Sequence, residues 1–325
     1  MRKTPLSWIS ALIVVAAAAL APAEEAPTYA QRLGWGPQDR VVIFHTDDVG
    51  MSHSMNRGAF EAYENGLATS ASVMMPCPWV PEVVEWLRTR PGADFGLHLT
   101  LTSEWKLYRW GPLAGAAAVP GLVDPEGCLW KDVASVLQHA TPDEIEREIR
   151  AQIERAERMG FNFTHLDSHM GTLFASPEYF KRYMKVGIEK QVPILMAGGR
   201  APNARRENPV PATLLAPLAE EVWNAGLPVI DDIHTASYNW KDKEEKSGRF
   251  VELLAQLEPG ITEVIIHCAM PDETLPVITS STDVRHGDFL AMMSSELRRA
   301  VEESGVILTN WTELMDRRRA AGRAE

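Results

Sequence analysis

The 325-residue chain has only three cysteines and no excess of basic residues, since 44 Asp and Glu outnumber 32 Lys and Arg to give a formal net charge of −12. Three cysteines are too few for a disulfide scaffold, although one bridge beside one free thiol is allowed, and their spacing matches no zinc motif. The acidic balance argues against nucleic acid as a partner and offers no basic patch for anionic lipids. Beyond the N-terminal segment the chain lacks 18 uninterrupted apolar residues, which excludes a later membrane-spanning helix.

The first 23 residues have the pattern of a secretory signal peptide. Arg2 and Lys3 form a short basic region, Leu6–Leu20 is apolar and uncharged, and Ala21–Ala23 fits a small-x-small cleavage site. We therefore expect an exported protein, periplasmic or secreted, with no stable membrane insertion after cleavage; an uncleaved signal anchor is the alternative. The remaining length suits a single α/β domain, which we place at residues 38–318, and leaves the oligomeric state open, a homodimer included.

Apolar, strand-like segments alternate with amphipathic helical segments along the rest of the chain. Helix starts are marked at Thr141, where a capping box is followed by proline, and at Ser176, which also precedes proline. Such alternation predicts parallel strands joined by helices. Seven or eight repeats favour an irregular, TIM-barrel-like (β/α) barrel over an open doubly wound sheet. The expected strands are 41–46, 71–75, 94–100, 164–168, 192–196, 228–233, 262–267 and 306–309.

Residues 101–139 interrupt this rhythm with glycines and aromatic residues. Trp105, Tyr108, Trp110 and Trp130 lie there, in a segment with few periodic positions. Insertions of this length are usually functional loops. The aromatic rings could stack on the faces of a sugar, or they could form a small core of their own, and the sequence does not decide between the two.

Groups that can bind a metal follow three of the expected strands. Asp47 and Asp48 come after the first strand, His98 lies near the end of the third, and His169 lies just past the fourth. A parallel barrel brings these strand ends onto one rim, where catalytic sites are built. One carboxylate and two imidazoles make a three-ligand site with open positions, which suits zinc, magnesium, manganese or iron(II). Taken singly, the acidic pair could instead be a helix-capping turn, and each histidine a hydrogen-bonded loop residue.

Several segments together resemble the YdjC-like carbohydrate deacetylases, a family that includes the chito-oligosaccharide deacetylases. The similarity extends from about Val41 to Trp311. The resemblance implies an irregular (β/α) barrel of the polysaccharide-deacetylase type that removes acetyl groups from N-acetylated sugars or oligosaccharides. The segments that carry it are His45–Ser52 with Asn56–Gly58, Gly66–Ser72, Gly96–Thr102 and Thr164–His169.

By matching positions, the resemblance implies a role for each candidate site residue. Asp48, His98 and His169 would hold one divalent metal ion, commonly magnesium in this family, with zinc as the alternative. Asp47 would be the general base, and His267, at the end of the seventh expected strand, the general acid. Asp167 is either the carboxylate that orients a ligand histidine or a plain turn residue.

Two departures from the family pattern keep other functions open. Met170–Thr172 replace further histidines after the fourth strand, and Cys268–Met270 stand where Pro-Gly often follows the late histidine. A metal-dependent carbohydrate O-acetyl esterase is therefore one alternative, and a sugar-binding barrel without turnover is another.

Other polar residues give weaker signals. Asp231 and Asp232, at the end of the sixth expected strand, could contact substrate hydroxyl groups or could serve a capping and loop role. Arg200 could steady Asp47 by its charge. The mixed-charge segment Lys241–Lys246 is most simply a solvated loop.

Overall fold

A computed structural model describes residues 26–198, 201–207 and 212–323, so the expected signal peptide lies outside the described residues. Every strand pairs in parallel with its neighbours, in the order β4-β3-β2-β1-β6-β5, and β7 pairs with the beginning of β1. The strands are β1 (Arg40–Val49), β2 (Ser70–Val73), β3 (Phe95–Leu99), β4 (Leu166–Ser168), β5 (Asp232–His234), β6 (Gly260–Ile266) and β7 (Ile307–Leu308).

An irregular segment closes the curled sheet between β4 and β5. Parallel bridges join Leu166 to Ile194 and Ala197 to Ile230, so residues 194–197 connect the two edges. The expected strand 192–196 therefore forms only isolated bridges to its neighbours. The expected strand 228–233 forms one bridge, at Ile230, and overlaps the first residues of β5. Pro193 contributes to this irregularity because proline cannot donate to a strand ladder. The predicted (β/α) barrel is confirmed, with one irregular sector.

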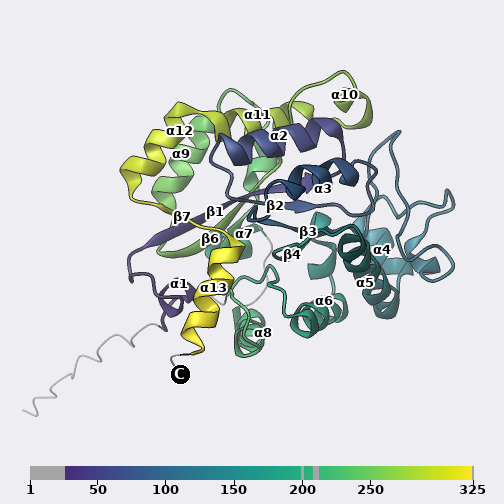
Figure 1. Ribbon diagram of the computed structural model, residues 1–325, viewed down its shortest axis with the longest axis horizontal. Helices are drawn as coiled ribbons and strands as arrows, with labels where there is room; N and C mark the ends of the chain where they lie inside the picture. The colour runs from purple at the N-terminus through teal and green to yellow at the C-terminus, as the bar shows by residue number, and fades with distance from the viewer. Residues whose placement is uncertain (1–25, 199–200, 208–211, 324–325) are drawn as a thin grey trace, which may run out of the picture.

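Helices surround the sheet (Figure 1). In this view α2, α3, α9, α11 and α12 lie above the strands, and α5, α6, α8 and α13 lie below. The capping box at Thr141 is present, and the Ser176 side chain accepts a hydrogen bond from the Glu178 backbone N–H, as the sequence predicts. The longer helices are α2 (His53–Glu64), α3 (Val80–Arg88), α5 (Pro142–Arg158), α6 (Pro177–Lys190), α8 (Ala212–Asn224), α9 (Lys246–Gln256), α11 (Thr282–Met293), α12 (Ser295–Ser304) and α13 (Trp311–Ala321).

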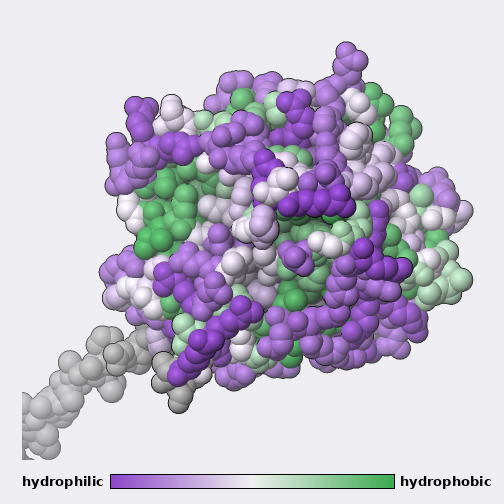
Figure 2. All heavy atoms as spheres, viewed as in Figure 1, coloured by the Kyte–Doolittle hydropathy of each residue, from purple (hydrophilic) through white to green (hydrophobic). Residues whose placement is uncertain are grey.

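Shorter helical turns complete the chain. They are α1 (Tyr29–Arg32), α4 (Val133–His139), α7 (Pro202–Glu207), α10 (Leu275–Ile278) and the 3₁₀ turns η1 (Pro120–Leu122), η2 (His169–Phe174) and η3 (Ala236–Asn239). None of the described helices is both long enough and apolar enough to cross a membrane. Figure 2 shows a mostly hydrophilic face with a hydrophobic patch beside α9 and α12, which also carry much of the smaller apolar core cluster.

Strand β1 separates two apolar cores by the alternation of its side chains. Val41 and Ile43 join the large core cluster, whereas Val42 and Phe44 pack into the cluster beneath α9 and α12. Since side chains alternate along a strand, His45 continues the face of Ile43. A polar residue, His45, therefore enters the barrel interior two residues before Asp47.

The aromatic side chains of the insertion pack with the large apolar core. Trp105 and Trp110 are buried, the Trp110 indole donates to the Thr102 carbonyl, and the Trp130 indole donates to the Gly121 carbonyl. The Tyr108 hydroxyl donates to the Met51 carbonyl at the end of β1. The Trp105 indole donates instead to the Glu104 carboxylate. The four rings thus pack with the large core and do not form the small core of their own that was one of the two interpretations. The three cysteines form no disulfide.

Candidate active site

A bulge at the end of β1 brings two consecutive carboxylates onto one site. The pairing of β1 with β2 shifts register between Thr46 and Val49, and Asp48 has a φ of 65°. A bulge places one extra residue on one strand and re-aims its side chain. Asp47 and Asp48 would otherwise point to opposite faces of the strand, yet both contact His98, at 3.7 Å and 3.3 Å from its Nε2 atom.

Asp48, His98 and His169 converge as the sequence predicts. The Asp48 Oδ1 atom lies 3.3 Å from His98 Nε2 and 3.1 Å from His169 Nδ1, and all three residues are buried. Asp48 Oδ1 has no hydrogen-bond partner of acceptable geometry among the described residues, although it is fully buried. Such an orphaned carboxylate oxygen beside two imidazole nitrogens fits a divalent cation, with ligand positions left over for water and substrate.

Each of the three candidate ligands also makes a hydrogen bond through the side-chain atom that points away from the proposed metal position. The Asp167 carboxylate accepts from His98 Nδ1 at 2.6 Å, and the Glu104 carboxylate accepts from His169 Nε2 at 2.9 Å. Arg285, from α11, donates to Asp48 Oδ2 at 2.7 Å. These partners fix the ring orientations and direct His98 Nε2, His169 Nδ1 and Asp48 Oδ1 toward one point. Asp167 therefore has the orienting role rather than that of a plain turn residue.

The charges of these partners shift the pKa values of the ligands. Burial opposes ionisation of Asp48, but the guanidinium of Arg285 and the two imidazoles hold its pKa well below the usual range. Burial likewise disfavours charged His169, yet Glu104 and Asp48 raise its pKa to about 9. The pKa of His98 is raised well above its usual value, against burial, by Asp47 and Asp167. The carboxylates around the two imidazoles therefore favour positive charge at this point of the site.

Asp47 and His267 face each other beside this ligand set. Asp47 Oδ2 lies 4.0 Å from His267 Nε2, while Asp47 Oδ1 is 3.2 Å from His45 Nε2 and accepts from Ser72 at 3.3 Å. His267 directly follows β6, and its backbone N–H donates to Asp288. Burial lowers the pKa of His267, whose Nδ1 atom is buried and has no partner among the described residues. All five predicted site residues thus lie in one cluster.

Three residues that contact the candidate ligands or Asp47 were not predicted from the sequence as part of the site. Arg285 lies 237 residues from Asp48 along the chain, and nothing local marks it. Its guanidinium lies 5.0 Å from the Trp105 ring. Glu104 follows the third strand at the start of the aromatic insertion, a position that could have been compared with the strand-end histidines. His45 precedes the acidic pair by two residues, on the same face of β1 as Asp47 by strand alternation.

Three weaker expectations are changed or lie outside the structure. Asp231 is at the opposite end of the barrel, where its carboxylate accepts from the backbone N–H groups of Tyr29, Ala30 and Ile261. It therefore anchors backbone, and does not join the site. The solvated-loop interpretation of Lys241–Lys246 is wrong at Lys246, which is fully buried against Asp288 at 2.6 Å. Arg200 lies outside the described residues.

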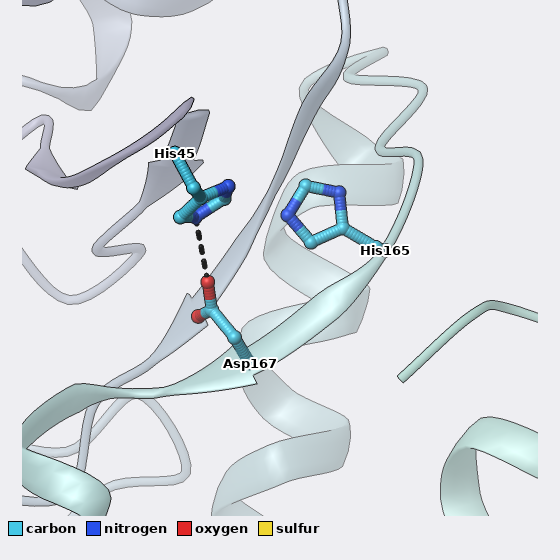
Figure 3. Close-up of side chains that lie close together, drawn as sticks. All are labelled: His45, His165 and Asp167. Atoms are coloured by element: carbon cyan, nitrogen blue, oxygen red, sulfur yellow. Dashed lines mark hydrogen bonds and ion pairs between the residues drawn. The ribbon is translucent and has the colours of Figure 1, made fainter. Parts of the chain in front are cut away.

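A second cluster, His45, His165 and Asp167, lies deeper in the barrel (Figure 3). Its geometry does not suit another metal. Both ring nitrogens of His45 already have hydrogen-bond partners. The Nε2 edge of His165 is pressed against Gly96, where an added Cβ would lie only 2.5 Å from that nitrogen. His165 Nε2 has no hydrogen-bond partner among the described residues but also no room for an ion beside Gly96. Within this cluster, His45 and Asp167 are the residues that contact the first site, through Asp47 and His98.

The fold and the site together define a (β/α)-barrel protein with a three-ligand, metal-type centre at the C-terminal ends of its strands. The chain belongs to the YdjC-like protein family, whose profile matches residues 41–303. The resemblance found in the motifs is thereby confirmed.

Known relatives cover most of the chain. A protein of Thermus thermophilus named carbohydrate deacetylase is 31% identical over 277 residues, which are 84% of this chain and 93% of that protein. A carbohydrate deacetylase of Thermoanaerobacter pseudethanolicus is 26% identical over 84% of this chain and 98% of its own. The crystal structure of an Enterococcus faecalis protein, described as a candidate for cellobiose-phosphate cleavage, matches with a TM-score of 0.72 and 24% identity, over 85% of this chain and 99% of that one. That likeness supports the fold.

Proposed function

We propose that this protein is a divalent-metal-dependent carbohydrate deacetylase that removes acetyl groups from N-acetylated sugars or oligosaccharides. The observation that carries the proposal is the convergence of three ligand atoms, from Asp48, His98 and His169, beside the facing pair Asp47 and His267. The names of the curated relatives support the reaction class. Magnesium is the metal expected from the family, with zinc as the alternative.

The residues of the site supply a metal-binding group, a general base and a general acid for amide hydrolysis. A divalent cation held by the three ligands would polarise the acetyl carbonyl group and lower the pKa of a water molecule. Asp47, whose Oδ2 atom is not engaged by His45 or Ser72, would accept a proton from the attacking water. His267, whose Nε2 atom lies 4.0 Å from Asp47 Oδ2, would in its protonated form deliver a proton to the departing sugar nitrogen. Arg285 would keep Asp48 ionised through its charge.

The direct test is acetate release from N-acetylglucosamine oligomers after chelation and add-back of magnesium or zinc. We expect metal-restored release that Asp48→Ala and His169→Ala both abolish, with Asp231→Asn, at the far end of the barrel, as a matched control that retains activity. No release from a broad panel of N-acetylated sugars by metal-loaded protein would contradict the proposal.

The O-acetyl esterase alternative is distinguished by substrate. Acetate release from O- and N-acetylated sugars at matched concentration decides which bond the protein prefers. A sugar-binding barrel without turnover predicts tight sugar binding that survives metal removal, with no hydrolysis of either bond. The intact pair of Asp47 and His267 argues against that last alternative.

We further propose that residues 1–23 direct export to the periplasm or beyond. The basic start, the apolar run and the small-residue cleavage site support it. N-terminal sequencing of protein from cell fractions is the test: a mature chain that begins after Ala23 supports export, and full-length protein in the cytosolic fraction contradicts it.

A further inference from the structure

His45 lies at the centre of a hydrogen-bonded chain beneath the ligand set. Its Nε2 atom is 3.0 Å from Asp167 Oδ2 and 3.2 Å from Asp47 Oδ1, and its Nδ1 atom is 3.0 Å from the Ser70 hydroxyl oxygen. The side chain is completely buried. One imidazole thus contacts the proposed base, Asp47, and also Asp167, the carboxylate that orients His98. Figure 3 shows the contact between His45 and Asp167.

The hydrogen-bond partners of His45 indicate which of its ring nitrogens carry a proton. The single hydroxyl proton of Ser70 is committed to Asp94, whose Oδ1 atom lies 2.6 Å away. The other Asp94 oxygen accepts from the backbone N–H and the hydroxyl group of Thr312. Burial raises the pKa of Asp94, but these bonds and that of Ser70 oppose the rise and favour the ionised carboxylate. His45 Nδ1 must therefore carry its own proton to bond Ser70. His45 Nε2 faces two carboxylates, which only accept, and the Ser72 hydroxyl oxygen at 3.1 Å, whose proton goes to Asp47 Oδ1. His45 Nε2 must therefore carry a proton as well.

The surroundings agree with a charged ring. Burial disfavours the imidazolium, yet Glu263, Asp167 and Asp47 raise the pKa of His45 well above its usual value. The neighbouring His165, whose ring centroid is 5.0 Å away, shows the reverse shift, because burial and the positive charge of His45 lower its pKa. A cation at His45 also relieves the repulsion between two buried carboxylates on either side of it.

We propose that His45 is a permanent buried imidazolium that positions both carboxylates of the site, Asp47 and Asp167. Through Asp47 Oδ1, shared with Ser72, it leaves Oδ2 as the oxygen that faces His267. Through Asp167 Oδ2 it steadies the carboxylate whose other oxygen holds His98 Nδ1. His45 is a positioning residue, because it reaches substrate and metal only through these partners. This part of the inference rests on the proposed function.

The protonation state can be tested without any activity. Nitrogen-15 NMR of the full chain, with and without magnesium, should show both ring nitrogens of His45 protonated near neutral pH, and His165 neutral. Assignment comes from the loss of each signal in His45→Gln and His165→Gln. A neutral, singly protonated His45 would place the proton on Asp94 and overturn the inference, whether or not the protein deacetylates sugars.

The positioning role is tested with variants measured at saturating metal on an N-acetylglucosamine oligomer. His45→Met keeps the volume but removes both donors, and we expect kcat to fall about 100-fold with KM nearly unchanged. His45→Gln restores donors near the same place and should recover about tenfold of that loss. His165→Gln, equally buried and outside the chain of hydrogen bonds to Asp47, is the matched control and should keep kcat.

The outcomes separate the two proposals. An inactive wild-type protein whose His45 is doubly protonated would defeat the proposed function and keep the buried cation. An active wild-type protein with unchanged kcat in His45→Met would defeat the positioning role. Equal losses of kcat in His45→Met, His45→Gln and His165→Gln would point to general damage to the barrel interior and would also overturn it.

Discussion

Glu104 touches the proposed metal site only through His169. Its carboxylate accepts from His169 Nε2 and also from the indole of Trp105, so it fixes the ring that presents Nδ1 to Asp48. We expect Glu104→Gln to weaken metal binding about 10- to 100-fold, because the neutral amide orients the ring less firmly and makes it a weaker ligand. Isothermal titration calorimetry gives the Kd. Glu126→Gln, an exposed ion-pair partner of Arg109 on the same insertion, is the control, and equal Kd values in both variants would contradict the assignment.

Metal binding should release protons from the ligand histidines. Metal-free His169 has a pKa of about 9, and that of His98 lies well above its usual value, whereas a histidine binds metal only when neutral. Below about pH 9 the cation must displace these protons, so affinity should tighten as pH rises and weaken as pH falls, with about two protons released near neutrality. Calorimetry in buffers of different ionisation enthalpy counts them. An affinity independent of pH from about 6 to 9 would show that both rings are already neutral.

The metal ligands could be predicted because Asp48, His98 and His169 lie at or just past the ends of recognisable apolar strands. The partners behind them could not, because Arg285 comes from a helix 237 residues away and Glu104 from an irregular insertion. The same limit applies to His45, whose role depends on Ser70 and Asp167 from two other strands. Local patterns thus identify residues at strand ends, whereas hydrogen-bonded partners are set by tertiary packing.

Among the elements, the prediction was least accurate where the backbone is irregular. Strand β1 and the helix that begins after Thr141 were predicted well, because burial and capping are encoded locally. The segment 192–196 looks like a strand in composition, but it contributes only bridges to its neighbours. Lys246 was placed in a solvated loop on its charge, although it is the first residue of α9 and its partner Asp288 lies on α11.

That buried pair joins α9 and α11 to the end of β6. Lys246 donates to Asp288 Oδ1 and to the Val284 carbonyl, while Asp288 Oδ2 accepts from the backbone N–H of His267. We expect Lys246→Met to lower the free energy of unfolding by about 3–5 kcal/mol, because it leaves a buried carboxylate without its counter-ion. Urea denaturation measures the change.

Two further variants make that prediction specific. Adding Asp288→Asn to Lys246→Met should recover part of the stability, because the uncompensated charge is then removed. Lys243→Met breaks an exposed pair with Asp283 and should cost at most about 1 kcal/mol. A loss in Lys246→Met no larger than that of Lys243→Met would show that water or another group compensates Asp288.

The proposed active site and the backbone anchor at Asp231 lie at opposite ends of the barrel. The proposed site lies where β1, β3, β4 and β6 end, whereas Asp231 lies beside the first residues of β6 and holds α1 against the barrel. Strand β6 has seven residues, so the two ends are about 20 Å apart. Residues at the lower end can therefore change without moving the catalytic groups.

We accordingly expect Asp231→Ala to destabilise the protein and leave its chemistry intact. The substitution removes the acceptor of three backbone N–H groups, from Tyr29, Ala30 and Ile261, and should lower the free energy of unfolding by about 3 kcal/mol or more. The kcat of the folded fraction should stay within about twofold of wild type. Asp48→Asn should instead abolish activity and also lower stability, because it leaves the buried guanidinium of Arg285 without its counter-ion. Thermal melts measure the stability of each variant, and acetate release by the same samples measures its activity. A parallel fall of kcat and stability in Asp231→Ala would show that the lower end of the barrel controls the geometry of the site.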